Sequence, residues 1–174
     1  MVVAGLESGS QKILDGINKR ITLEQAEKFV QNARGANLRV HGCFMAGNMG
    51  ETLGTLDETL RFALKLPLDT AQFFPLMIYP GTEAYEWADK NNFIKANGFR
   101  DWLTSEGMHN CVLNTEALKA AELVDFCDQA RRSFYLRPGY LLYKMVDVLM
   151  NPAEIGRTFK AATRLFGHLF KVHR

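Results

Sequence analysis

The chain has 174 residues, of which 47% are hydrophobic and 23% charged, and its formal net charge is +2. This size and composition predict a globular protein with one domain, or a small domain with a helical appendage, and they exclude a disordered chain. A charge so close to balance gives no reason to expect a nucleic-acid partner.

The N-terminal half alternates short apolar runs with amphipathic stretches. Strands are predicted over residues 2–6, 38–45 and 71–78. Pro75 lies within the last of these and marks an edge, a bulge or an early end. Helices are expected in the segments between and after the strands, namely 11–17, 22–35, 55–66 and 83–91. Strands and helices in alternation are typical of parallel β/α architecture.

Threonines mark the expected helix starts. Thr22 and Gln25 have the spacing of a capping box, and Thr55 and Glu58 repeat it. Thr82, which follows a Tyr-Pro-Gly turn, is expected to cap the next helix.

The pattern changes after residue 97. Residues 98–114 are predicted to be irregular, and from Thr115 onward the chain is predicted to be helical, with helices over about 115–136 and 140–149 and a third after Pro152. We therefore expect three parallel strand–helix units in residues 1–97, followed by an all-helical extension in residues 98–174.

Ligands of parallel β/α folds bind at the C-terminal ends of the strands. This rule selects the loops 7–10, 47–52 and 75–82. Two of them contain glycine and lead into a helix N-terminus, where free backbone amides favour an anionic or polar ligand. Each loop taken singly is better explained as an ordinary turn.

Four motifs in order along the chain make the pattern more specific. They are Gly5-Leu6-Glu7-Ser8-Gly9-Ser10, then Asn18-Lys19, then Phe44-Met45-Ala46-Gly47 with Gly50-Glu51-Thr52, and finally Tyr79-Pro80-Gly81-Thr82-Glu83. In order and spacing they resemble the radical SAM superfamily, most closely the branch that often carries an N-terminal cobalamin-binding domain. The resemblance covers about residues 1–95 and implies the C-terminal half of a (β/α)6 partial barrel. It extends more loosely to the C-terminal helices, including Phe134-Tyr135-Leu136-Arg137-Pro138.

The resemblance implies binding of S-adenosylmethionine (SAM) around the first strand. Glu7 and Ser8 would approach the ribose and the methionyl end of SAM, and Lys19 would approach its carboxylate, with Arg20 as the neighbouring candidate. A carboxylate can accept hydrogen bonds from the ribose hydroxyls and attracts the ammonium and sulfonium groups. Lys19 is equally well explained as a solvated surface lysine.

The second and third strands would supply the remaining contacts. By the resemblance, Cys43 lies near the ribose, Met45 packs against the adenine, Gly47 belongs to the following loop, and the backbone of Met77 meets the adenine edge. His41 would face the same interior, because alternate residues of a strand share a face. A hydrogen-bonded core histidine is the simpler interpretation of His41.

Two features depart from the family pattern. The loop 47–52 has Asn48-Met49 where the family commonly has Leu-Pro, which loosens the turn. The CxxxCxxC motif that holds the 4Fe–4S cluster is absent, and the three cysteines are too far apart in sequence to replace it. The cluster would therefore belong only to a longer parent protein. Because SAM is not cleaved reductively without it, we expect this chain alone to be inactive.

The sparse cysteines also predict reduced thiols, no metal site and a cytoplasmic protein. No signal peptide is recognisable, and no apolar stretch is long enough to span a bilayer.

The leading hypothesis is a fragment of a radical SAM iron–sulfur oxidoreductase or methyltransferase. Its partner would be the missing N-terminal half or a second copy of the chain. The substrate, a small molecule or a lipid-like compound, stays open, and so does the use of cobalamin by the parent.

Two other hypotheses compete with it. One is a non-catalytic assembly module that dimerises through the exposed edges of a half barrel. The other is a peripheral membrane protein, because residues 152–174 carry five basic residues against Glu154, opposite an apolar face. The same pattern is more often that of a helix packed on its own domain with a solvated basic face.

Overall fold

The computed structural model describes residues 1–104 and 109–150, together with the single residues 156, 160 and 163. The chain divides into two compact units, residues 1–127 and 128–174, and the division falls within α5 (Ala120–Tyr135). The domain boundary that we predicted between residues 97 and 98 stays a prediction. The helix predicted after Pro152 lies outside the described residues, apart from the three single ones.

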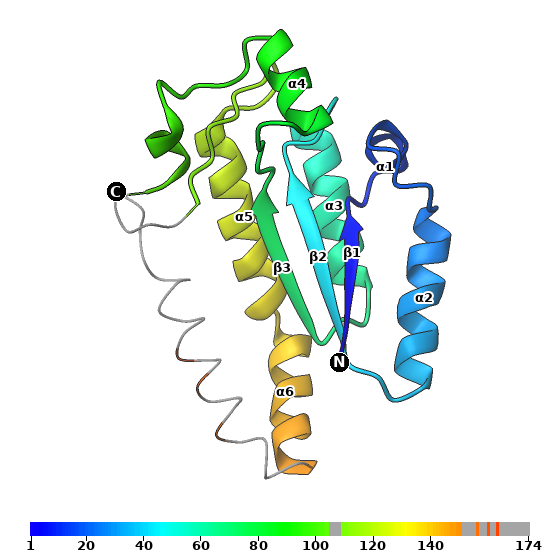
Figure 1. Cartoon of the computed structure of the whole chain (residues 1–174). Helices are drawn as coiled ribbons and strands as arrows, with labels where there is room; N and C mark the ends of the chain where they lie inside the picture. Colours follow the sequence, from blue (N-terminus) through cyan, green and yellow to red (C-terminus); the bar gives the residue numbers. More distant parts are fainter. Residues whose placement is uncertain (105–108, 151–155, 157–159, 161–162, 164–174) are drawn as a thin grey trace. The chain divides into compact units, whose positions relative to one another are not determined.

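A three-stranded parallel sheet forms the centre of unit 1. The strands β1 (Val2–Glu7), β2 (Val40–Ala46) and β3 (Thr70–Pro75) lie side by side in this order and all end at the same edge (Figure 1). This confirms the predicted parallel β/α arrangement, whereas the partial barrel stays a prediction. Pro75 is the last residue of β3, as expected of a residue that cannot donate to the ladder.

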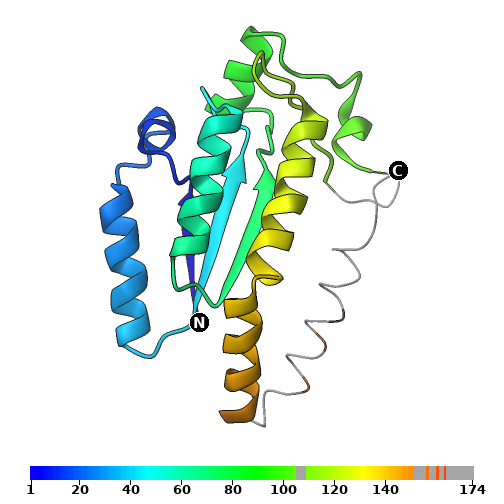
Figure 2. The ribbon, with the colours of Figure 1, turned by 180° about the vertical axis from the view of Figure 1, so that it is seen from behind.

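Helices follow each strand. After β1 come α1 (Gln11–Gly16) and α2 (Leu23–Gly35), after β2 comes α3 (Leu53–Lys65), and after β3 comes α4 (Glu83–Lys90). Seen from behind, α2, α3 and the first part of α5 lie on one side of the sheet (Figure 2). No described helix of unit 1 lies over the opposite face, which is turned toward the viewer in Figure 1.

Capping explains where the helices begin. The predicted capping box at Thr22 and Gln25 is confirmed, because each side chain accepts a hydrogen bond from the backbone amide of the other. The box predicted at Thr55 and Glu58 is wrong. The helix α3 begins one turn earlier, where Thr52 and Thr55 cap each other. The Thr55 hydroxyl takes the place of the usual carboxylate, so a search for Glu or Gln three residues after the cap misses this box.

Alternation along the strands separates a core face from a second face. The core face meets the helices and is buried; its residues include Leu6, Val40, Phe44, Ala71 and Phe73. Phe44 and Phe73 stack with ring centroids 5.2 Å apart. Burial of each ring contributes about 2–3 kcal/mol to stability. These contacts hold β2 and β3 against the helices.

We call the other side of the sheet the open face. It consists of Val3 and Gly5 on β1, of His41, Cys43 and Met45 on β2, and of Thr70, Gln72 and Phe74 on β3. All of these residues are half-buried or exposed, up to 63% exposure for Val3. The prediction that His41, Cys43 and Met45 share one face is confirmed.

The chain between α4 and α5 is largely irregular, as predicted. Its described part contains a short 3-10 helix (Phe99–Trp102) and two isolated antiparallel bridges, which join Ile94 to Leu113 and Leu103 to His109. The next helix begins at Ala120 and not at Thr115. The Thr115 hydroxyl accepts a hydrogen bond from the Leu118 amide, which forms a turn before the helix.

Unit 2 contains the end of α5 and the helix α6 (Pro138–Met150). Proline at the first position of α6 suits a helix start, because its missing amide would have no partner there. An aromatic cluster joins the two helices: Phe134 lies 5.4 Å from Tyr140 between ring centroids, and the Arg137 guanidinium lies 4.3 Å from the centre of the Phe134 ring.

Candidate ligand-binding site

The three loops selected from the sequence meet at one edge of the sheet. Because the strands are parallel, Glu7, Gly47 and the segment after Pro75 all follow strand ends on that edge (Figure 1). The open face adjoins this edge, and α4 lies above it in the view of Figure 1. This arrangement brings the predicted site residues of three separate motifs to one region of unit 1.

Glu7 ends β1 in an unusual backbone conformation. Its φ is +63°, and the register between β1 and β2 shifts between Gly5 and Glu7. The carboxylate forms an ion pair with Lys19, with 2.9 Å between Oε1 and Nζ. A Cβ atom at Gly5 would lie 2.5 Å from Glu7 Oε1 and 3.2 Å from Lys19 Nζ. Glycine is therefore needed at position 5 for this pair to lie across β1.

Glu7 and Lys19 were predicted to contact different ends of one ligand, and the structure pairs them with each other. Arg20, the alternative to Lys19, has a positive φ of 56°. The side chain of Glu7 is 17% exposed and that of Lys19 is 32% exposed, so both still reach the surface. A bound ligand with a cationic and an anionic group could exchange with this pair without leaving either charge unmatched.

Ser8 is fully buried and faces α3. Its Oγ lies 3.0 Å from Thr59 Oγ1 and accepts a hydrogen bond from the Ser10 amide. The Gly9 amide donates to the same Thr59 hydroxyl. In this conformation Ser8 supports the turn that carries Glu7, and its predicted contact with SAM stays a prediction.

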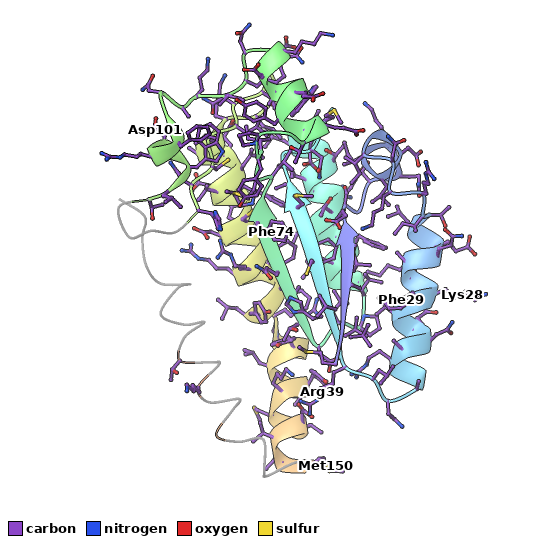
Figure 3. All side chains as sticks on the ribbon, viewed as in Figure 1. Lys28, Phe29, Arg39, Phe74, Asp101 and Met150 are labelled. Atoms are coloured by element: carbon purple, nitrogen blue, oxygen red, sulfur yellow. The ribbon has the colours of Figure 1, made fainter. Side chains whose placement is uncertain are left out.

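Cys43 and Met45 lie in successive rows of the open face. Cys43 is in register with Gly5 on one side and Gln72 on the other, and Met45 is in register with Phe74, which is labelled in Figure 3. Burial, and to a lesser degree the negative charge of Glu7, raises the pKa of the Cys43 thiol. The thiol is therefore protonated near neutral pH and presents a neutral surface.

His41 lies farther from the loops, toward the start of β2. Its Nδ1 is 2.7 Å from the hydroxyl of Thr70, the residue in register on β3. This bond supports the interpretation of His41 as a hydrogen-bonded structural residue.

Glu51 closes the loop after β2. One carboxylate oxygen accepts hydrogen bonds from the amides of Gly47 and Asn48, and the other, Oε1, is buried with no hydrogen-bond partner. Burial raises the pKa of Glu51 to about 7, although the two amides oppose the rise. Gly47 has a φ of +102°, and a Cβ there would lie 2.9 Å from a methyl group of Leu123.

These contacts hold the loop in a defined shape although it contains no proline. Glu51 was predicted only as part of the Gly50-Glu51-Thr52 motif, and its role in closing the loop was not predicted. A carboxylate placed four residues after a glycine and just before a helix was the available signal.

The loop after β3 brings Met77 to the same edge. The Leu76 amide donates to the Ala46 carbonyl at 2.7 Å, which extends the pairing just past β3. The backbone of Met77, the next residue, has no hydrogen bond among the residues that the structure describes. It could therefore meet the edge of a planar ligand. The prediction for Met77 is compatible with this placement but is not tested by it.

His109 and Trp102, which contact the segment after β3, were not predicted from the sequence. The Tyr79 hydroxyl lies 3.3 Å from Nδ1 of His109, which belongs to the irregular segment before α5. Trp102 anchors that segment by donating from Nε1 to the Ile78 carbonyl. Nothing in the spacing of these residues along the sequence predicts that they meet.

Within the described ranges, no group of three or more Asp, Glu, His or Cys side chains could hold a metal ion. Cys111 and Cys127 are buried, while Cys43 lies on the open face. The cysteines of this chain therefore do not fit an iron–sulfur cluster. No helix in the described part of the chain is both long enough and apolar enough to cross a membrane.

The fold defines a β/α protein with a parallel sheet, in which the C-terminal ends of the strands form the candidate ligand site. No protein-family model matches the chain. Over 141 residues, 81% of its length, it is 34% identical to the uncharacterized methyltransferase PH0819 of Pyrococcus horikoshii.

Two further relatives are more distant. The chain is 29% identical over 110 residues to the bacteriochlorophyllide d C-8(2)-methyltransferase of Chlorobaculum tepidum, which covers 62% of this chain. It is 25% identical over 143 residues to the anaerobic magnesium-protoporphyrin IX monomethyl ester cyclase of Rubrivivax gelatinosus, which covers 82% of it. The chain spans only 30%, 24% and 24% of the lengths of these three proteins. It is thus similar to one region of longer proteins named as methyltransferases and a cyclase.

Proposed function

We propose that this chain forms the SAM-binding part of the core of a radical SAM enzyme, and that the complete protein is a methyltransferase. The proposal rests on the placement of Glu7, Cys43 and Met45 toward the C-terminal ends of the neighbouring strands β1 and β2. This placement occurs in a chain that is 34% identical to a protein named a methyltransferase. We favour methyl transfer over ring closure as the activity, because two of the three relatives described above are named methyltransferases.

In this proposal the residues of the edge divide between the two ends of SAM. Glu7 binds the ribose hydroxyls or the ammonium group, and Lys19 binds the carboxylate, so the ion pair between them opens as the ligand enters. Met45 and the Met77 backbone contact the adenine, and Cys43 lies beside the ribose as a neutral thiol. SAM would supply the methyl group, or the 5′-deoxyadenosyl group that starts radical chemistry.

The iron–sulfur cluster of such an enzyme has no ligands among the described residues. It would belong to the part of the longer protein that this chain does not include, and the same holds for cobalamin. We therefore expect the isolated chain to bind SAM without turning it over.

Titration calorimetry with SAM tests the proposal on the purified chain. We expect a dissociation constant in the micromolar range and at least about tenfold weaker binding by the Glu7→Ala variant, since a charge-assisted hydrogen bond contributes about 1.5–3 kcal/mol. Glu24→Ala, at an exposed position on α2, is the matched control and should bind like the parent chain. Absence of binding, or equal binding by Glu7→Ala, would count against a site preformed in this chain.

A second candidate function is assembly through the sheet. In the described part of the chain, β1 pairs only with β2, so no strand lies beside its other edge, and the neighbouring open face is partly apolar. Such an edge favours pairing with the missing half of the protein or with a second copy. Light scattering should then show a dimer that Val3→Lys dissociates and Leu53→Lys, an equally exposed position on α3, does not. A compact monomer would rule out the second copy.

A further inference from the structure

The helix α6 exposes a continuous apolar surface. Six of its side chains are between 43% and 76% exposed, and all of them are apolar: Leu141, Leu142, Met145, Val146, Leu149 and Met150. They recur as adjacent pairs at intervals of four residues, which places them along one side of the helix. We call this side the α6 apolar face. Isolated surface leucines are common, but six contiguous apolar side chains on one helix require a partner.

The opposite side of α6 is already occupied. Tyr140 is buried, and its ring contacts Phe134 and Tyr143 within unit 2. The Lys144 ammonium lies 4.9 Å from the centre of the Tyr143 ring and 3.7 Å from the Asp147 carboxylate. These contacts fix which side of the helix turns outward.

Charge is distributed unevenly along the chain. Residues 137–174 contain seven lysines and arginines against two acidic residues, a net charge of +5, whereas the whole chain carries +2. Residues 1–136 therefore carry −3. The positive excess therefore belongs to the part of the sequence that includes α6, and among the described residues that follow α6, Lys160 is exposed.

We propose that α6 binds the surface of an anionic lipid bilayer, with its apolar face inserted among the headgroups, and that the net positive charge of the segment 137–174 attracts the chain to that surface. An apolar helix face beside basic residues is the combination that interfacial helices use. Each lysine or arginine near an anionic surface adds to the attraction, while the net negative charge of residues 1–136 directs binding to the C-terminal part.

The net positive charge argues against a second copy of the chain as the occupant of the α6 apolar face. A second copy docked through the same face would bring two segments of net charge +5 together. The described part of α6, 13 residues, measures about 20 Å against a hydrocarbon core of about 30 Å and is too short to span a bilayer. The inference does not depend on SAM binding, because it concerns a different part of the chain.

Co-sedimentation of the full chain with vesicles tests the proposal. We expect binding to phosphatidylcholine vesicles that contain phosphatidylglycerol, weaker binding to pure phosphatidylcholine, and weakening as salt is raised. The double variant Leu142→Gln/Leu149→Gln should reduce partitioning to anionic vesicles by about tenfold or more, because two leucines no longer insert.

The matched control is Leu53→Gln/Leu103→Gln, two exposed leucines of unit 1, which should bind like the parent. Circular dichroism establishes that both double variants remain folded, as expected for changes at exposed positions. Three results would overturn the proposal. They are no binding of the parent to anionic vesicles, equal binding by Leu142→Gln/Leu149→Gln, or a dimer that this variant dissociates in the absence of vesicle binding.

Discussion

Replacing Glu51 by glutamine should remove a large part of the pH dependence of stability. The Glu51 side chain is buried in the loop after β2, with one oxygen on two backbone amides and the other without a partner. Burial raises its pKa from 4.5 to about 7 in the folded protein. The folded state therefore holds a proton at pH values where the unfolded state has released it.

The sign and size of the effect follow from linkage. A raised carboxyl pKa contributes stability that is fully present below about pH 4.5 and is lost as pH rises through about 7. At about 1.36 kcal/mol per pH unit, the difference corresponds to about 3 kcal/mol lost between these limits. Glutamine does not titrate, so this contribution disappears. Its buried amide costs about 1–3 kcal/mol at every pH, because it leaves donors without partners.

Urea unfolding followed by tryptophan fluorescence at several values between pH 5 and pH 8 measures the effect. The free energy of unfolding of the parent should fall more steeply with pH than that of Glu51→Gln, by about 2–3 kcal/mol over this range. Glu58→Gln, at an exposed position on α3, should keep the parent's pH dependence. Identical slopes for the parent and Glu51→Gln would refute the reasoning.

Three further predictions test other contacts. Gly9→Ala should destabilise the protein by about 1–3 kcal/mol in urea unfolding, because its Cβ would lie 2.6 Å from Phe62 Cβ and 2.7 Å from the Thr59 Cα. Gly54→Ala, whose Cβ would have no atom nearer than 3.7 Å, should stabilise the protein by about 0.5–1 kcal/mol. Equal effects of the two substitutions would contradict the packing argument. Asp69→Asn should lower the unfolding free energy by about 2–4 kcal/mol, since the buried carboxylate accepts hydrogen bonds from Arg34 and from the Val40 amide. A loss below about 0.5 kcal/mol would show that the pair of Asp69 and Arg34 contributes little to stability. Iodoacetamide should modify Cys43 faster in Glu7→Gln than in the parent at pH 8, because removal of the negative charge lowers the thiol pKa. An unchanged rate would show that the charge of Glu7 does not affect the thiol pKa.

Local signals in the sequence were sufficient for much of the fold. Alternation along residues 40–46 predicted that His41, Cys43 and Met45 share one face, because the period of a strand is two residues whatever surrounds it. Thr22 and Thr82 predicted helix starts correctly, because a cap depends on residues within one turn. The convergence of three loops at one edge followed from the parallel order of the strands.

Contacts between distant residues were decided only by the tertiary structure. Ser8 was predicted to face a ligand, but it meets Thr59, 51 residues away, and no local pattern encodes that contact. Glu7 and Lys19 were each predicted to contact a ligand, and nothing in the sequence indicated that they also pair with each other.

The same limit applies to surfaces. Amphipathic spacing suggested a membrane-facing helix in residues 152–174, nearly all of which lie outside the described residues, and it did not single out the apolar face that α6 exposes. Spacing along a helix identifies an apolar side, but whether that side is covered depends on what packs against it, and only the folded chain supplies that information.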